Sequence, residues 1–511
     1  VLTTGADKAQ TKKLTKIEMR GNSYLKTEEP GKASEMKARD MDFFFDEQQQ
    51  LKSAVGTGSA YARSLEKDSP REVTAEKIEA IYRPAENGSV IQQINTSGRT
   101  LMKIVVAEKN DVSERVIEAN ETKAYFREDG QNLDRAEANG DAVLTITPKK
   151  ITPTAEKKTL HGAKFNAEFY ETGNTLKTFV ADGKAVAYIE PLQNDGKRMK
   201  RTLSGNKMTG SFDQQTQDVT ELVADGNAKF NEGERNGTSA RATYRSETKL
   251  VELRGKPLLW DSTARANADE IDTNVETEES YLRGRVRTTY LDREAIAQTT
   301  PFKGRKAPVT IVADRAVTKH REGAARYFGN VRAWQEDDFV RAENMELDKG
   351  ERTMLAWGNA QSIFYDFERE VEKGRKEIVP VFAQSDRITY RDETRTAHYE
   401  GTVKIRQGTD RVDSAVADAV MDDDNKLVSW TGDKDVVITQ PFRRATGDHV
   451  VYTASTDTAV LTGEPAIAKD NERETETKSP KLTMHLHDAR IEANDESGMH
   501  KRVKTTHRIQ K

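Results

Sequence analysis

Apolar and polar residues alternate along most of the chain, and a glycine recurs at regular intervals within this pattern. Successive glycines of the set are separated by 29–31 or by 42–45 residues. Because randomly placed glycines would not fall into two narrow classes, the spacing predicts an internal repeat. We interpret the difference of about 13 residues as an added loop or hairpin. The set comprises Gly56, Gly98, Gly140, Gly183, Gly226, Gly255, Gly284, Gly329, Gly358, Gly401, Gly432 and Gly463.

The residues before each glycine predict a pair of β-strands. A carboxylate that follows a small residue stands 15 positions before several of the glycines, as Asp314 does before Gly329 and Asp386 before Gly401. Between Asp386 and Gly401, two alternating stretches flank the polar residues 391–394. Alternation with a period of two, interrupted by turn residues, is typical of antiparallel strands. Each repeat of about 30 residues is therefore predicted to hold two strands and two turns, with the carboxylate capping a turn at a strand start.

One face of the strand after each glycine is predicted to be apolar. Positions two and four after the glycine share a face, whereas position three, on the other face, is polar in later repeats, as at Arg332 and Lys404. This pattern is typical of an antiparallel sheet with one solvated side. The predicted inward-facing set is Met102, Leu144, Phe230, Leu259, Val331, Val403, Ile405, Val436, Ile438 and Ile467.

A single strand pair cannot bury its apolar face, so the repeats predict an all-β fold in which about twelve strand pairs stack around one apolar strip. From periodicity alone, two arrangements of this strip remain open. It is either an open trough with room for an acyl chain or a closed core in which small and large residues interdigitate. We predict a tail at 1–15, an N-terminal module at 16–300 with the longer repeats, a C-terminal module at 301–498, and a basic tail or edge strand at 499–511.

Composition excludes several functional classes. Of the 511 residues, 35% are hydrophobic, and 81 Lys and Arg nearly balance 85 Asp and Glu. A formal net charge of -4 gives no basic field, so we expect no binding to nucleic acid. With no cysteine there is neither a disulfide framework nor a thiolate site. No apolar run reaches the ~20 residues of a membrane-spanning helix, and a start at Val1 without a signal-peptide pattern is expected of a processed or a cytosolic chain.

Candidate catalytic and metal-binding groups are few. His485 and His487 lie two residues apart, with His500 and His507 downstream, and we interpret them as outward polar residues rather than a zinc site. The acidic run 422–424 lacks the ligand spacing of a calcium loop. No Gly-x-Ser-x-Gly nucleophile motif occurs. We therefore predict that the protein is not an enzyme and uses no metal or cofactor.

Two repeats end in a more particular pattern, in which a Tyr near the start of the stretch is followed by Leu-x-Gly-x-Pro. They are residues 244–257, ending in Leu253-Arg254-Gly255-Lys256-Pro257, and residues 452–465, ending in Leu461-Thr462-Gly463-Glu464-Pro465. Together with Val312-Ala313-Asp314 and Phe328-Gly329-Asn330-Val331, they resemble the OstA/LptA/LptC family of lipopolysaccharide-transport proteins. The resemblance is clearest over 309–470 and extends more weakly back to about residue 20.

The resemblance implies an open β-jelly roll, or β-taco, located in the periplasm and without enzymatic activity. It implies that acyl chains of lipopolysaccharide, or of a related acylated glycolipid, slide along the apolar interior from an inner-membrane extractor to an outer-membrane translocon. The implied partners are other Lpt jelly-roll proteins, joined end to end by strand pairing, and head-to-tail self-association is a further expectation. Any membrane association is expected to run through partners or a removed N-terminal segment.

The residues themselves support one rival interpretation. A structural or adhesive β-solenoid with a closed core would show the same periodicity and bind no lipid. A carbohydrate-active or metal-dependent enzyme on a β scaffold is a third interpretation, which no group of residues in the sequence supports.

Overall fold

The fold was analysed in a computed structural model. It describes residues 2–6, 12–29, 32–66, 71–86, 88–107, 112–153, 155–172, 174–193, 199–216, 218–292, 296, 298–302, 307–365, 368–372, 375–423, 426–486, 490–494 and 503–507. The protein is all-β, as the alternating pattern predicts. It divides into two compact units, residues 1–257 (unit 1) and 258–511 (unit 2).

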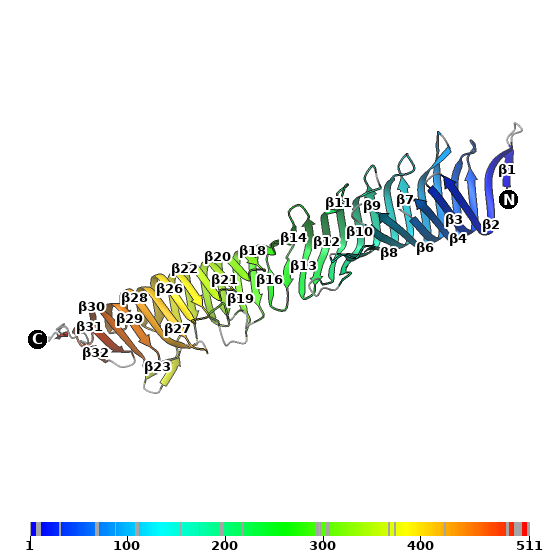
Figure 1. The fold of residues 1–511 in the computed structure, drawn as a ribbon. Helices are drawn as coiled ribbons and strands as arrows, with labels where there is room; N and C mark the ends of the chain where they lie inside the picture. Colours follow the sequence, from blue (N-terminus) through cyan, green and yellow to red (C-terminus); the bar gives the residue numbers. More distant parts are fainter. Residues whose placement is uncertain are drawn as a thin grey trace. The chain divides into compact units, whose positions relative to one another are not determined.

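Unit 1 is built from strands that pair antiparallel with their neighbours in sequence, from β1 to β14 (Figure 1). The strands are β1 (Leu2–Ala6), β2 (Lys12–Glu29), β3 (Lys32–Phe45), β4 (Leu51–Glu66), β5 (Arg71–Ala85), β6 (Gly88–Ala107), β7 (Val112–Phe126), β8 (Leu133–Pro148), β9 (Glu156–Phe169), β10 (Leu176–Pro191), β11 (Arg201–Phe212), β12 (Val219–Glu232), β13 (Arg235–Arg245) and β14 (Leu250–Arg254).

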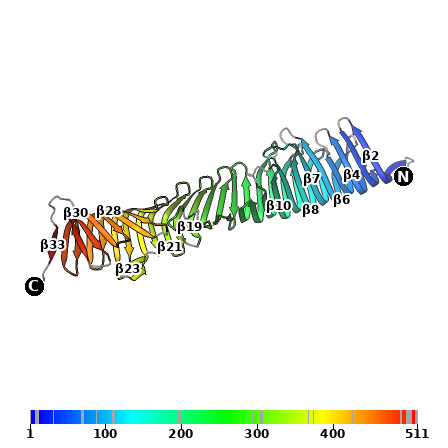
Figure 2. The same ribbon diagram turned by 60° about the horizontal axis from the view of Figure 1, so that its bottom comes forward.

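Unit 2 continues the same antiparallel order from β18 to β31, with a separate hairpin of β23 and β24 (Figure 2). Its strands are β15 (Leu258–Trp260), β16 (Ala264–Asn267), β17 (Glu270–Asn274), β18 (Glu279–Tyr290), β19 (Val309–Lys319), β20 (Ala324–Gln335), β21 (Asp338–Asp348), β22 (Thr353–Phe364), β23 (Glu368–Glu372), β24 (Arg375–Ile378), β25 (Val381–Arg391), β26 (Thr396–Gln407), β27 (Asp410–Met421), β28 (Leu427–Thr439), β29 (Arg443–Thr453), β30 (Thr458–Asp470), β31 (Thr475–His485), β32 (Ile491–Asn494) and β33 (Lys504–His507).

Each long strand bends near its middle, and the pairing register shifts at the bend. In β20 the bend lies at Gly329 and Asn330, whose φ angles are 76° and 50°. Pairing with β19 and β21 is interrupted at this level. Residues before and after the bends pack together in one buried cluster, as Leu461 of β30 and Ile438 of β28 show. The two halves of every strand therefore belong to two facing sheets that enclose the core.

The bends correct three details of the predicted repeat. In β4 the left-handed pair is Gly58 and Ser59, two residues after Gly56. In β28 the pair is Lys434 and Asp435, so Gly432 is likewise displaced by two. The recurring carboxylates do not start strands. Asp314 lies in the middle of β19, against the bend glycine of β20.

The longer of the two glycine spacings has a different cause in each unit. In unit 1, β2 to β10 contain 14–20 residues, so the longer spacing comes from longer strands and the predicted extra hairpin was wrong there. In unit 2 the full-length strands contain 11–13 residues. There the longer spacings come from the connection between β18 and β19 and from the β23–β24 hairpin.

The chain ends also carry strands. Within 1–15, where a polar tail was expected, β1 pairs with residues 12–17 of β2. Near the C-terminal end, β31 begins at Thr475 and its Ser479 is buried. β32 and β33 pair with β31 at 481–484 and 475–478. β1 therefore covers part of the outer edge of β2, and β32 and β33 cover most of the outer edge of β31.

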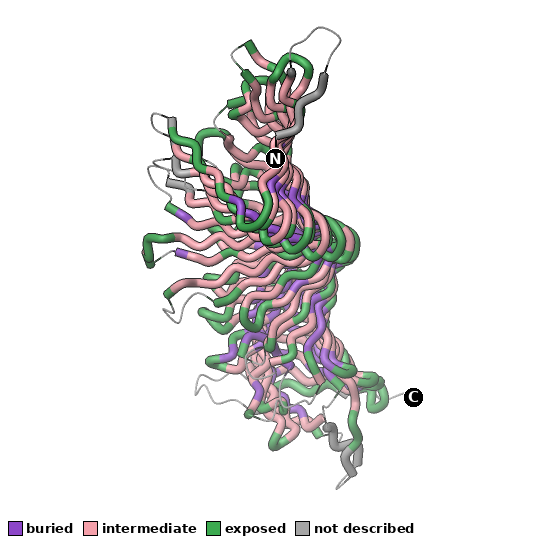
Figure 3. The backbone as a smooth tube through the Cα atoms, turned by 90° about the vertical axis from the view of Figure 1, so that its right-hand side faces the viewer, coloured by how far each residue is buried: buried purple, intermediate pink, exposed green. Residues whose placement is uncertain are grey.

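The two units are packed differently. Among the described residues, unit 1 buries eighteen hydrophobic residues, of which twelve are alanines, whereas unit 2 buries forty, of which twenty-five are larger than alanine. Figure 3 shows that buried segments are short stretches within the strands, flanked by intermediate and exposed ones. The interior of unit 2 is thus filled by its own side chains to a greater extent than that of unit 1.

Within the described residues, no helix is both long and apolar enough to cross a bilayer.

Candidate functional site

The interior of unit 1 is lined by alanines next to the bends. On either side of Gly183 lie Ala181 and Ala185, and both are completely buried. Ala224 and Ala228 flank Gly226 in the same way. These alanines, Phe165 and Met208 form one buried cluster. Because the inner positions closest to the bend are small, they fill little of the space between the two sheets.

Apolar side chains, most of them larger than alanine, follow farther along the strands, four residues after the bend glycines and at the paired positions of the intervening strands. Register places them side by side across eleven consecutive strands. We call them the unit 1 row. They are Leu25, Met36, Ala62, Val73, Met102, Ile117, Leu144, Leu160, Ala187, Leu203 and Phe230.

The unit 1 row lies against the core without being buried in it. Leu144, Leu160 and Leu203 pack against the alanine-rich cluster and remain partly exposed. None of the eleven residues is buried, and Phe230 is 36% exposed. A continuous line of accessible apolar side chains on the core side of a sheet can bind an extended apolar ligand, since burying each methylene group of such a ligand is favourable.

The structure brings three of the ten predicted inward residues together in this row, namely Met102, Leu144 and Phe230. The others belong to unit 2. Val331, Val403, Val436 and Ile438 are buried, while Leu259 and Ile405 are partly buried. Ile467 alternates with the buried Ala466 and Ala468 and so lies on the other face, because the register shifts between Thr462 and Ala466. A role for the ten in lining a lipid path stays a prediction.

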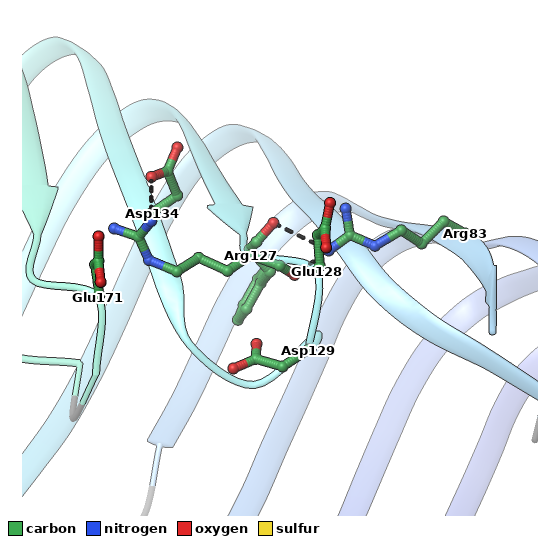
Figure 4. A pocket seen from close by; sticks show the side chains of 7 residues that line it. Arg83, Arg127, Glu128, Asp129, Asp134 and Glu171 are labelled. Atoms are coloured by element: carbon green, nitrogen blue, oxygen red, sulfur yellow. Dashed lines mark hydrogen bonds and ion pairs between the residues drawn. The ribbon is translucent and has the colours of Figure 1, made fainter. Parts of the chain in front are cut away.

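A cavity of about 560 Å³ lies at the turns of unit 1 and has a different character (Figure 4). Arg83 donates to the Phe126 carbonyl at 3.3 Å, and Arg127 donates to the Phe169 carbonyl at 3.0 Å. Arg127 also pairs with Asp134 at 3.2 Å. Backbone amides hold the pKa of Asp129 below its usual value. Both guanidinium groups thus link one turn to the next, and four carboxylates outnumber them, so the cavity does not favour an anion.

Three of the histidines pair with carboxylates on neighbouring strands. His398 Nδ1 lies 2.7 Å from Asp418, His449 Nδ1 lies 2.6 Å from Asp433, and His485 Nε2 lies 3.4 Å from Glu492. His487 and His500 lie outside the described residues. Among the residues that the structure describes, no group of three or more His, Cys, Asp or Glu could hold a metal ion.

Comparison with known proteins gives a consistent result. Residues 196–279 and 383–489 match the family described as "LptA/(LptD N-terminal domain) LPS transport protein". The chain is similar to this family over these two segments, which together hold 191 of its 511 residues (84 and 107). Among solved structures, it is similar to LptH of Pseudomonas aeruginosa, the LptA-homologous periplasmic component of a lipopolysaccharide-transport device. The identity is 18%, the match covers 26% of this chain and 96% of that one, and the TM-score is 0.23. No curated protein matches the chain.

The family agrees with the resemblance found in the sequence, and its matched segments fall in both units. The description of the family supports a role in lipopolysaccharide transport in general. Sequence reasoning missed the strand-to-strand continuity of the unit 1 row. The signal that could have found it is the apolar residue three positions before the bend in the intervening strands, such as Leu160 and Leu203.

Proposed function

We propose that the protein binds acyl chains of lipopolysaccharide, or of a related acylated glycolipid, and passes them across the periplasm between the inner and outer membranes. The observation that carries this proposal is the unit 1 row, a continuous line of accessible apolar residues on the core side of eleven strands. The family match supports lipopolysaccharide as the cargo.

The energetics of such a row suit transport. An acyl chain gains about 0.8 kcal/mol for each methylene group it buries, so several shallow contacts hold it without a charged ligand. Strands repeat every ~4.8 Å, and each contributes one similar apolar residue. Because no residue of the row dominates the binding, an acyl chain can move from one position to the next without crossing a large barrier.

We propose Met102, Leu144 and Phe230, the predicted inward residues that lie in the unit 1 row, as lining residues. For the predicted residues of unit 2, which are Leu259, Val331, Val403, Ile405, Val436, Ile438 and Ile467, a lining role stays a prediction of the sequence.

Partners would bind at the sheet edges by strand addition. β1 covers β2 only over residues 12–17, and among the described residues no further strand pairs with that edge from Met19 onward. At the other end, β32 and β33 are the outermost described strands. These edges are the proposed contacts with other Lpt jelly-roll proteins of the extractor and translocon, or with a second copy of the chain.

One observation favours the rival function of a lipid-free structural solenoid. The interior of unit 2 is filled with its own side chains, including Ile311, Tyr327 and Leu461, which are fully buried. A chain with this packing throughout would have no room for a ligand.

Lipid extraction and native mass spectrometry of the protein purified from lipopolysaccharide-producing cells distinguish the two functions. We expect an acylated glycolipid to co-purify with the wild-type chain. Leu144→Asp places a charge in the row and should reduce the bound glycolipid at least tenfold. Val143→Asp is the matched control, because the neighbouring side chain lies on the opposite face of β8. Absence of lipid from the wild-type protein would favour the solenoid, whereas equal loss in both variants would show that the unit 1 row is not the binding surface.

A further inference from the structure

Unit 2 contains a row in the same structural position as the unit 1 row. It too begins four residues after a bend glycine, with Thr288 after Gly284, and register carries it across twelve strands. This unit 2 row is Thr288, Ile311, Ala333, Val340, Ser362, Ala383, Ile405, Val412, Ile438, Ala445, Ala468 and Thr477. Nine of the twelve are buried, whereas none of the unit 1 row is buried. The equivalent surfaces of the two units therefore differ in accessibility.

The unit 2 row is covered by two tyrosines of the facing sheet, Tyr327 and Tyr399. Tyr327 precedes the bend of β20, and Tyr290 follows the bend of β18, so the two residues belong to opposite sheets. Their hydroxyl oxygens lie 2.8 Å apart. In the same way, Tyr399 of one sheet reaches Ser362 of the row on the other sheet, at 3.0 Å. Tyr327 and Tyr399 are 0% and 4% exposed.

The residue two positions before a bend glycine is large at several bends of unit 2 and small over part of unit 1. It is Leu282, Tyr327, Ala356 or Tyr399 before the bend glycines of unit 2, and Ala138, Ala181 or Ala224 in β8, β10 and β12 of unit 1. All seven are buried. An alanine at this position stops short of the opposite sheet, whereas a tyrosine spans the interior and bonds to a hydroxyl group there.

We propose that unit 1 alone binds acyl chains, and that in unit 2 the cross-sheet contacts Tyr327–Tyr290 and Tyr399–Ser362 occupy the space that the lipid takes in unit 1. This inference rests on the proposed function. An acyl chain entering unit 2 would have to separate both hydroxyl pairs, and it offers no group that could bond to the hydroxyls left behind. In unit 1 the same chain displaces only water from partly exposed apolar side chains.

Matched photo-cross-linking probes test the proposal. Leu160 and Ile311 hold equivalent positions in the two rows, each three residues before the bend residue of its strand. A small diazirine-bearing aliphatic amino acid is placed at either position of the full chain, which is then loaded with purified lipopolysaccharide. We expect at least tenfold more cross-linked glycolipid at position 160 than at position 311. Combining the probe at 311 with Tyr327→Ala and Tyr399→Ala should restore capture there, whereas Tyr327→Phe and Tyr399→Phe, which keep the rings, should restore much less.

The outcomes separate this inference from the proposed function. Equal capture at both positions of the otherwise wild-type chain would overturn the inference and leave lipid binding intact. Capture at neither position would overturn the proposed function itself. If a probe at the buried position 311 prevents folding, hydrogen exchange of the unmodified chain decides the same question. Added lipopolysaccharide should slow exchange within 12–232 and leave 279–485 unchanged, and protection of both regions would contradict the proposal.

Discussion

The bend glycine Gly329 offers a sharp test of how the repeat is built. Its φ angle of 76° is one that residues with a side chain rarely adopt, and a Cβ there would come within 3.0 Å of the Asp314 Cβ. Gly323, in the turn between β19 and β20, has a φ angle of 69°, and its nearest neighbour would be Lys349 Cβ at 3.3 Å. Both alanine variants incur the left-handed backbone strain of about 1–2 kcal/mol. Only Gly329→Ala adds overpacking, which costs a further ~1–3 kcal/mol.

Tryptophan fluorescence is a suitable assay, because all four tryptophans, Trp260, Trp334, Trp357 and Trp430, lie in unit 2. At about 3 °C for each kcal/mol, Gly329→Ala should lower the unfolding midpoint of unit 2 by roughly 3–9 °C more than Gly323→Ala does. Asp314→Gly should recover most of this difference when combined with Gly329→Ala, measured against Asp314→Gly alone. Equal destabilisation by the two glycine variants would refute the close contact at the bend.

Two further predictions concern the packing of the rows. Ile311→Ala should destabilise its unit by about 2–5 kcal/mol, as expected for a buried residue, and Leu160→Ala should destabilise its unit by clearly less, because its position is partly exposed in the absence of lipid. Denaturant titration followed by circular dichroism would show the difference. Equal losses of stability would contradict the open interior of unit 1. Burial raises the pKa of Tyr327 and of Tyr399, so these groups hold their protons more tightly in the folded chain than in the unfolded one. Their contribution is complete below about pH 10, where an unfolded tyrosine begins to ionise, and decreases as the pH rises further. The unfolding midpoint of unit 2 should therefore decrease above that pH, and the decrease should be smaller in a chain carrying Tyr327→Phe and Tyr399→Phe.

The sequence predicts the strands, their antiparallel order and most of the inward face, because a period of two and a recurring turn are local properties. It misplaces the bend where the left-handed pair departs from the glycine. At Lys434 and Asp435 two residues with side chains adopt positive φ angles of 62° and 53°, so no glycine marks that bend. At Ile467 the register shift moves the inner face by one residue, to Ala466 and Ala468. Both departures depend on pairing with neighbouring strands, which the local pattern does not record.

Whether a row is open or closed depends on the opposite sheet, and periodicity carries no information about it. Leu144 and Ile438 both lie four residues after the bend position of their strands, yet only Ile438 is buried. The difference comes from the side chains of the facing half-strands. At other bends the sequence does show the residue that fills the interior, as Tyr327 and Tyr399 do two positions before their glycines, but its meaning requires knowing that this position points across the interior.

The unit with the longer strands is also the one whose interior is less filled. This is expected if unit 1 is adapted to hold a ligand. After its bend at Gly183, β10 continues for eight residues to Pro191, whereas β20 continues for six residues beyond Gly329 to Gln335. At about 3.3 Å per residue, β10 extends roughly 7 Å farther beyond its bend than β20 does. Longer walls around a fully packed core would only expose more surface to water. Longer walls around an interior of alanines and partly exposed leucines place additional protein on both sides of the row, which increases the apolar surface that a bound acyl chain could contact.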